Sequence, residues 1–246
     1  MKIYTYGIID AHDRIRDEAI LGLEGARIYT IYYLDIGIVV SELEQQTRYI
    51  EDNILEHERV VEKLMEYFTV LPMRFLTVFD RKEDIIQMLK DYYRDFKKNL
   101  KRLRNKVEFG VKVIWPGDKV REEIASAYTK QYELPIANNS AGAKFIQEKF
   151  KEYKIDKKYE EEANRQIEVI DKFFCEFASE KKLEKHLNKS LLLNAYYLID
   201  KEKQSTFKEG FERLKGAASG FNYLFSGPWP PYNFIILNKK SYSLKA

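Results

Sequence analysis

Cysteine is almost absent from this chain, and long apolar runs are missing. The single cysteine, Cys175, excludes an internal disulfide framework and suits a reducing compartment. No stretch approaches the ~18 uninterrupted apolar residues that a membrane-spanning helix needs. Residues 1–6 enter a strand pattern without the apolar run and cleavage site of a signal peptide. The sequence therefore predicts a cytoplasmic protein that does not enter a membrane.

An excess of charge of one sign is also missing. The 42 basic and 39 acidic residues leave a formal net charge of +3, which is typical of a mixed, solvated surface. We therefore expect no nucleic-acid partner. Aromatic residues, at 14%, and apolar residues, at 45%, supply ample material for a core. A length of 246 residues is comfortable for two domains.

The motifs of common enzymes and cofactor sites are absent too. The sequence has no glycine-rich nucleotide loop and no G-x-S-x-G nucleophile elbow. His57-Glu58 begins like a zinc-protease helix, but that motif needs a second histidine where Val61 stands. Cys175 has no histidine nearby in sequence and is interpreted as core packing. We expect no catalytic residues, no metal and no cofactor.

Hydrophobic periodicity predicts an α+β domain over residues 1–116. Alternating or β-branched runs favour strands, and one-sided apolar spacing favours helices. The expected strands cover residues 2–9, 26–33, 36–41, 70–79 and 107–115, and the expected helices cover residues 46–68 and 80–103. Two helices on one face of an antiparallel sheet make a ferredoxin-like arrangement. The Pro116-Gly117-Asp118 turn marks the end of this domain.

Residues 117–246 are expected to form a smaller α+β domain with a helical insert. The expected helices cover residues 118–132, 141–153, 156–179 and 201–218. The continuous apolar run at residues 191–200 predicts a buried strand, and residues 221–226 predict another. A tail rich in proline and aromatic residues follows.

Arg74 lies inside the apolar segment Val70–Phe79. An unpaired charge would be costly there, so the guanidinium needs a carboxylate or several carbonyls. Glu58 and Glu62 on the preceding helix are the candidate partners, and they would give a structural ion pair between helix and sheet. The alternative is an anionic ligand, because arginine suits bidentate contacts with carboxylate or phosphate.

A basic run lies near the end of the second predicted helix. It contains Arg94, Lys97, Lys98, Lys101, Arg102, Arg104 and Lys106. Cations are favoured at a helix C-terminus, so a solvated face is the simplest interpretation. The alternative is an anion site, which would make the chain an anion- or nucleotide-responsive regulator or enzyme on a ferredoxin-like scaffold. RNA binding would need stacking aromatics that residues 108–111 do not supply.

Residues 227–234 form the most unusual segment of the chain. Three prolines, a tryptophan and two other aromatic residues lie within these eight positions. Proline fixes φ and removes a backbone donor, so the segment is stiff and is neither a helix nor a central strand. It either closes the core or docks on a partner, since aromatic residues dominate interface hot spots. The candidate interaction residues are Trp229, Pro230, Pro231, Tyr232 and Phe234.

Seven short segments, spread along nearly the whole chain, carry a family resemblance. They are residues 4–9, 22–25, 39–41, 57–62, 71–75, 107–113 and 228–232. In this order they resemble the gas vesicle GvpL/GvpF family. The match departs at Leu76, where the family pattern usually has glycine, and is loose over Ser140–Phe145.

The resemblance implies an α+β fold and a non-enzymatic role in gas vesicle formation. It also implies an accessory or minor structural protein, associated with gas vesicles, whose partners are the main shell protein and other accessory proteins. That shell protein is small and very apolar, and exposed apolar surfaces and strand edges promote aggregation before assembly. We therefore expect the chain to bind the shell protein and to aid its assembly.

Overall fold

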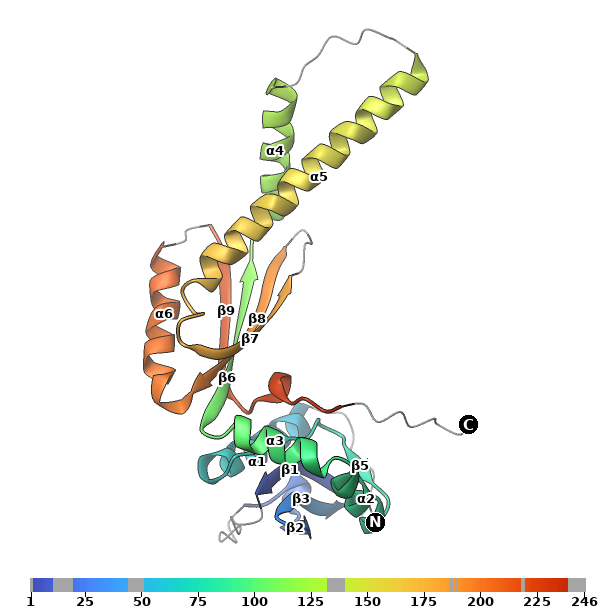
Figure 1. Ribbon diagram of the computed structural model, residues 1–246, viewed down its shortest axis with the longest axis vertical. Coiled ribbons are helices and arrows are strands. Elements are labelled where there is room, and N and C mark those ends of the chain that lie inside the picture. The colour runs from blue at the N-terminus through green and yellow to red at the C-terminus, as the bar shows by residue number, and fades with distance from the viewer. Residues whose placement is uncertain are drawn as a thin grey trace. The chain divides into compact units, whose positions relative to one another are not determined.

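The computed structural model describes residues 2–10, 20–43, 51–131, 140–185, 188, 190–217 and 220–238. Its contacts divide the chain into two compact units, residues 1–108 with 228–246 and residues 109–227. Each unit contains an antiparallel sheet with helices, so the expected α+β fold with two domains is confirmed (Figure 1). The predicted boundary lies at residues 116–117, whereas this division falls between residues 108 and 109 and also assigns residues 228–246 to the first unit.

The first unit is built on a sheet in which β1 is central. Its strands are β1 (Lys2–Asp10), β2 (Ile28–Tyr33), β3 (Ile36–Leu43), β4 (Leu71–Pro72) and β5 (Val78–Phe79). The order is β2-β3-β1-β4, and β5 also pairs with β1. All of these pairs are antiparallel, and β1 carries a register shift between Thr5 and Gly7. The expected hairpin is confirmed, with Leu34 at its turn in the left-handed region at a φ of 51°.

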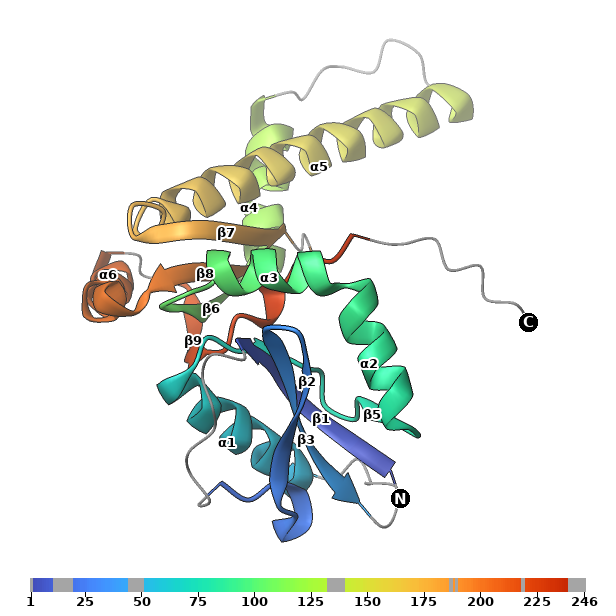
Figure 2. The same cartoon turned by 60° about the horizontal axis from the view of Figure 1, so that its bottom comes forward.

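Helices cover both faces of this sheet, which corrects the expectation of one covered face. They are α1 (Glu51–Tyr67), α2 (Lys82–Asp91) and α3 (Tyr93–Arg102). α1 packs against β1 on one side, while α2 contacts β2 and α3 contacts β1 and β3 (Figure 2). Both alternating faces of β1 and β3 are consequently buried. The expected long second helix is divided at Tyr92, whose ψ of 12° leaves the helical range.

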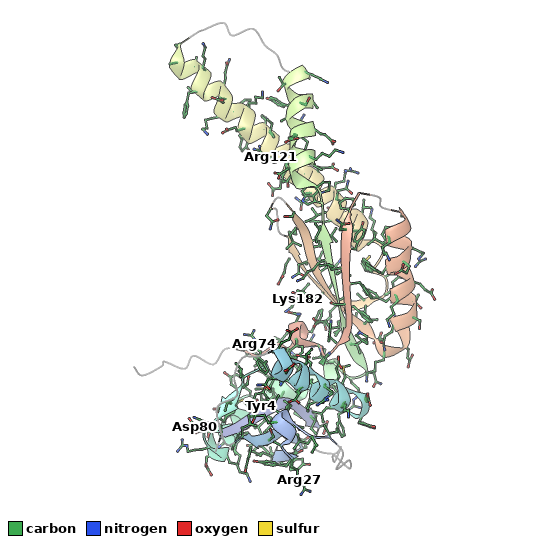
Figure 3. The ribbon with its side chains drawn as sticks, turned by 180° about the vertical axis from the view of Figure 1, so that it is seen from behind. Tyr4, Arg27, Arg74, Asp80, Arg121 and Lys182 are labelled. Atoms are coloured by element: carbon green, nitrogen blue, oxygen red, sulfur yellow. The ribbon has the colours of Figure 1, made fainter. Side chains whose placement is uncertain are left out.

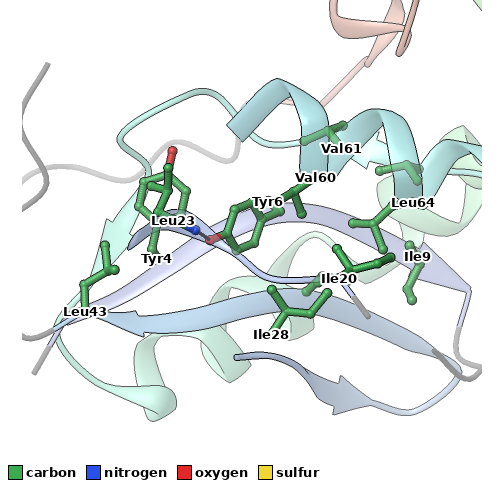
Figure 4. Packing of buried hydrophobic residues seen from close by; sticks show 12 residues of the cluster. Tyr4, Tyr6, Ile9, Ile20, Leu23, Ile28, Leu43, Val60, Val61 and Leu64 are labelled. Atoms are coloured by element: carbon green, nitrogen blue, oxygen red, sulfur yellow. Dashed lines mark hydrogen bonds between the residues drawn. The ribbon is translucent and has the colours of Figure 1, made fainter. Parts of the chain in front are cut away.

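The core under α1 combines aliphatic residues with two tyrosines. Val60, Val61 and Leu64 of α1 face Tyr4 and Tyr6 of β1 (Figure 4). The Tyr6 hydroxyl lies 2.9 Å from the Ser41 hydroxyl and accepts a hydrogen bond from the Leu23 amide. These bonds satisfy a buried phenol and fix the short helix η1 (Leu23–Gly25) against the sheet.

Two sequence predictions about strands were wrong. The expected strand over residues 70–79 is two short strands, β4 and β5, because Leu76 has a φ of 66° and the chain turns there. The expected fifth strand of the first sheet, residues 107–115, is β6 (Lys106–Ile114), and it pairs in the second sheet. Its apolar periodicity gave the strand correctly, but periodicity carries no information about which sheet a strand joins.

The second unit holds a sheet of order β7-β8-β6-β9. Its other strands are β7 (Ala178–Lys185), β8 (Leu191–Asp200) and β9 (Asn222–Trp229). Its helices are α4 (Gly117–Gln131), α5 (Ala141–Asp171), η2 (Lys201–Lys203) and α6 (Gln204–Ala217). The core contains a cluster of buried rings that pack against one another at tilted angles: Phe109, Phe174, Tyr197 and Phe207. The buried strand predicted at residues 191–200 is confirmed as β8.

The helical insert differs from its prediction in two ways. The two helices expected at residues 141–153 and 156–179 are one helix, α5, since neither glycine nor proline separates them. The second expected helix ends earlier than predicted, at Asp171, and after turns over residues 172–177 the chain enters β7, which was not predicted. β7 is a highly charged edge strand, and such strands lack the apolar alternation on which strand prediction depends.

Candidate functional site

The C-terminal segment, defined here as residues 228–238, packs within the first unit. It leaves the edge strand β9, where prolines are tolerated because an edge has no second neighbour to bond. Pro230 and Pro231 are buried, and the short helix η3 (Tyr232–Phe234) follows. The Phe234 side chain is only 2% exposed. The segment therefore closes the core of the first unit, which was one of the two sequence interpretations.

Paired hydrogen bonds from side chains fix this segment in place. The Glu108 carboxylate accepts from the Asn233 amide nitrogen at 2.9 Å and from Asn233 Nδ2 at 2.5 Å. Asn99 of α3 accepts from the Ile236 amide at 3.1 Å and donates to the Ile236 carbonyl at 2.7 Å. Asn99 and Glu108 are both buried, so each of these bonds satisfies a group that would be costly to leave unpaired.

The remaining anchors lie at the two ends of α3. Arg102 donates to the carbonyl of Phe234. Asp95 accepts from the backbone amide and from Nδ2 of Asn238, at 2.9 and 2.8 Å. The segment is therefore held along its length from Tyr232 to Asn238, mainly by polar groups of α3 and β6.

His57 of α1 lies at the centre of a buried polar cluster beside this segment. Its Nε2 lies 3.1 Å from the carbonyl of Met73, which can only accept, so Nε2 carries the proton. Nδ1 then accepts from the Tyr4 hydroxyl at 2.9 Å, and that hydroxyl accepts from the Leu76 amide. Burial lowers the pKa of His57 to about 4, so the ring is neutral near pH 7.

Tyr232 extends this cluster into the C-terminal segment. Its hydroxyl donates to Oε1 of Glu58 at 3.0 Å and lies 3.4 Å from Nε2 of His57. Burial raises the pKa of Tyr232, and the neighbouring Glu58 carboxylate raises it further. Burial also raises the pKa of Glu58, while the bond from Tyr232 acts in the opposite direction. The pair is best described as a neutral phenol donating to a half-buried carboxylate.

Three apolar side chains of the C-terminal segment remain exposed. Trp229 is 37% exposed, and Ile236 and Leu237 are 56% and 43% exposed. Of the five predicted interaction residues, Trp229 is therefore the most available to a partner. Ile236 and Leu237 were missed by the sequence analysis, although the apolar run at residues 234–237 was a signal for them.

Arg74 does not pair as the sequence analysis proposed. It is exposed in the loop after β4, and its carbonyl accepts from the amide of Thr77 at 3.1 Å; Figure 3 labels it in the first unit. Within the described ranges, no ion pair joins Arg74 to Glu58 or Glu62. The reason is the turn at Leu76, which leaves the guanidinium in solvent and removes its need for a buried partner.

The basic run is partly used inside the first unit. Lys97 lies 2.7 Å from Asp35 and 3.3 Å from Asp10, and the bond from Lys97 lowers the pKa of Asp35. Arg102 is committed to the C-terminal segment. These contacts neutralise part of the positive face that the anion-site alternative requires.

The part of the chain that the structure describes gives little support for a metal site or for a membrane-spanning helix. No cluster of three or more His, Cys, Asp or Glu side chains there is arranged to hold a metal. The interpretation of Cys175 as core packing was wrong, since the residue is exposed after the end of α5. No described helix combines the length and the apolar character needed to cross a membrane.

Comparisons with known sequences agree over nearly the whole chain. Residues 2–235 match the family model described as "Gas vesicle synthesis protein GvpL/GvpF". The chain is 26% identical over 244 residues to gas vesicle protein F1 of Halobacterium salinarum, covering 96% of this chain and 94% of that protein.

Two solved structures share the fold. The crystal structure of the gas vesicle protein GvpF from Anabaena sp. PCC7120 aligns with a TM-score of 0.79 at 20% identity, covering 98% of both chains. GvpF from Microcystis aeruginosa aligns with a TM-score of 0.81 at 19% identity, covering 96% of this chain and 99% of that one. At such identities the likeness concerns the fold.

Proposed function

The chain belongs to the gas vesicle GvpL/GvpF family and is involved in gas vesicle formation, and we propose that it binds the main shell protein and aids its assembly. The family match over residues 2–235 is the observation that carries this proposal. The proposed role is that of an accessory or minor structural protein without enzymatic activity, acting in the cytoplasm with the shell protein and other accessory proteins.

The physical need for such a protein comes from the shell protein itself. A small and very apolar subunit exposes surfaces that aggregate before they are buried in a wall. A binding protein that covers those surfaces reversibly would keep the subunit available for assembly. The binding surface of this protein must be apolar enough to compete with self-association of the shell protein. The rest of its fold must leave that surface exposed.

The exposed apolar residues of the C-terminal segment meet this description. Trp229 is the last residue of strand β9, and Ile236 and Leu237 belong to the stretch that Glu108 and Asn99 hold in place. A pre-ordered segment loses less conformational entropy on binding than a free tail. Pro230, Pro231, Tyr232 and Phe234 would then act by positioning these residues, while Trp229 makes the contact.

Co-expression with tagged chain tests the proposed surface. The parent should retain the shell protein. The triple variant Trp229→Ala, Ile236→Ser, Leu237→Ser should retain at least about tenfold less, because truncating an aromatic hot spot costs ~2 kcal/mol or more. Leu21→Ser is the matched control, since Leu21 is 53% exposed in the first unit but lies outside the segment.

The outcomes separate the role from the site. If the triple variant loses the shell protein while the parent and the Leu21→Ser control retain it, the result supports both the proposed role and the proposed surface. Equal retention by parent and triple variant would keep the partner but reject this surface. If the parent itself retains no shell protein, the proposed function is wrong.

A further inference from the structure

The first half of α5 carries an apolar stripe that the fold leaves uncovered. Its members are Phe145, Ile146, Phe150 and Tyr153, which are between 56% and 68% exposed. Ile146, Phe150 and Tyr153 follow the i, i+4, i+7 spacing that places side chains on one helix face. Single exposed apolar residues are ordinary, but four within nine positions form a continuous surface of the kind that marks an interaction site.

The neighbouring helix does not account for this stripe. Contacts between α4 and α5 include the Arg121–Asp156 ion pair at 2.7 Å and Lys158 over the ring of Tyr128. Ile155 is the first buried residue of α5. In Figure 3 side chains project freely from the part of α5 beyond the level of Arg121. The stripe therefore lies on a section of helix without cover from the described part of α4.

Local interactions hold this section of helix. Ser140 is its N-cap and accepts from the amide of Ala143 at 3.2 Å. Lys149 pairs with Glu152 at 2.7 Å, one turn apart, and similar pairs follow along the helix. The stripe is consequently not needed to form the helix, and substitutions in it should leave the fold intact.

The charge around the stripe restricts what can cover it. Residues 141–158 contain six lysines, at positions 144, 149, 151, 154, 157 and 158, against Glu148, Glu152 and Asp156. The difference, 6 − 3, is +3, which equals the net charge of all 246 residues. Lys149 and Lys154 lie beside the stripe, because each is three or four residues from one of its members, and the ammonium of Lys154 lies 5.1 Å from the centre of the Phe150 ring. A second copy of the same stripe would bring like charges together, so self-pairing is disfavoured.

We infer that the stripe is the docking site for an amphipathic helix of a partner protein, one with an apolar face and acidic flanks. The apolar face of the partner would cover Ile146, Phe150 and Tyr153, and its carboxylates would meet Lys149 and Lys154, one on each side of the stripe. A stripe from Phe145 to Tyr153 spans about 13 Å, so two to three turns of a partner helix suffice. The inference goes beyond the proposed function, because it concerns another surface and does not depend on which protein supplies the helix.

A synthetic helix provides the probe. A labelled peptide with a leucine face and glutamate flanks is titrated with the full chain and followed by fluorescence anisotropy. A peptide with lysine flanks and a scrambled glutamate peptide are the controls. The chain should bind the first at least about tenfold more tightly than either control, a difference of about 1.4 kcal/mol.

Two variants locate the binding. Ile146→Ser with Phe150→Ser should weaken binding of the glutamate peptide at least about tenfold while every charge is kept. Lys149→Glu with Lys154→Glu should reverse the preference toward the lysine peptide. Leu224→Ser, which changes a 58% exposed residue of the same unit, should leave both affinities unchanged.

Three results would overturn the inference. The first is equal or absent binding of the glutamate and lysine peptides. The second is retention on vesicles containing phosphatidylserine, lost in the Ile146→Ser, Phe150→Ser variant, which would indicate a membrane surface instead. The third is a dimer in sedimentation that the same variant abolishes, which would indicate a second copy.

Discussion

Phe234→Ala is expected to lower the free energy of unfolding of the first unit by about 3–5 kcal/mol. Phe234 is 2% exposed although it lies near the end of the chain, and its carbonyl accepts from Arg102. Removing the ring leaves a cavity in a place where Asn99 and Glu108 hold the backbone, so the site cannot easily collapse. The measured loss of stability should therefore include both the transfer free energy of the ring and the full cost of the cavity that it leaves.

Urea unfolding measures this loss in a Trp115→Phe background. The chain has two tryptophans, and this change leaves Trp229, in the first unit, as the only one. Phe145→Ala is the matched control, because it makes the same substitution at a residue that is 61% exposed, and it should change stability by less than about 0.5 kcal/mol. A similar, small effect for Phe234→Ala would show that the C-terminal segment is not part of the core.

Acid should destabilise the first unit through His57. Its pKa is lowered by burial from 6.5 to about 4, so the unfolded chain binds a proton between these values and the folded chain does not. The free energy of unfolding is therefore not reduced by His57 above pH 6.5, and it falls as the pH drops from about 6.5 to about 4. A shift of this size corresponds to about 3 kcal/mol.

Neighbouring groups alter the observed slope, so a variant is needed to isolate His57. Burial raises the pKa of Glu58, which means that its protonation stabilises the folded state as the pH falls and offsets part of the loss. Tyr4, Tyr6 and Tyr232 have raised pKa values and do not titrate in this range. His57→Gln should flatten stability between pH 6.5 and 4 relative to the parent. Parallel curves for both proteins would contradict a buried, neutral His57.

Local patterns were sufficient to predict most of the elements. The runs that become β1 and β8 are apolar and partly β-branched, and both strands were placed almost to the residue. The helix around His57 was expected from its one-sided apolar spacing, and α1 confirms it within the described residues. These predictions succeeded because the information lies within the segment itself.

Long-range pairing could not be predicted in the same way. Glu108 alternates with apolar residues along β6, which is typical of a solvent-facing position, yet it is buried and bound to Asn233. Its partner is 125 residues away, and nothing in the local pattern indicates that the tail returns. The prediction for Arg74 was wrong in the opposite direction. Its apolar sequence neighbours indicated burial, but a turn at Leu76 places it in solvent.

The candidate interaction site was therefore only partly visible in the sequence. The prolines predicted a segment that is neither a helix nor a central strand, and this was wrong at Tyr232–Phe234, which form the short helix η3. The same residues gave no sign that Phe234 would be buried while Ile236 and Leu237 stay exposed. That division is set by Asn99, which bonds both backbone groups of Ile236. An asparagine in a helix is not by itself a signal for this contact.

One measurement tests the central claim most directly. Denatured shell protein is diluted into buffer with and without the purified full chain, and the supernatant is analysed after centrifugation. The account predicts that the shell protein stays in the supernatant and elutes together with this chain, in proportion to the amount of chain added. If the shell protein sediments equally in both samples and the chain elutes alone, the proposed role in binding the shell protein is contradicted.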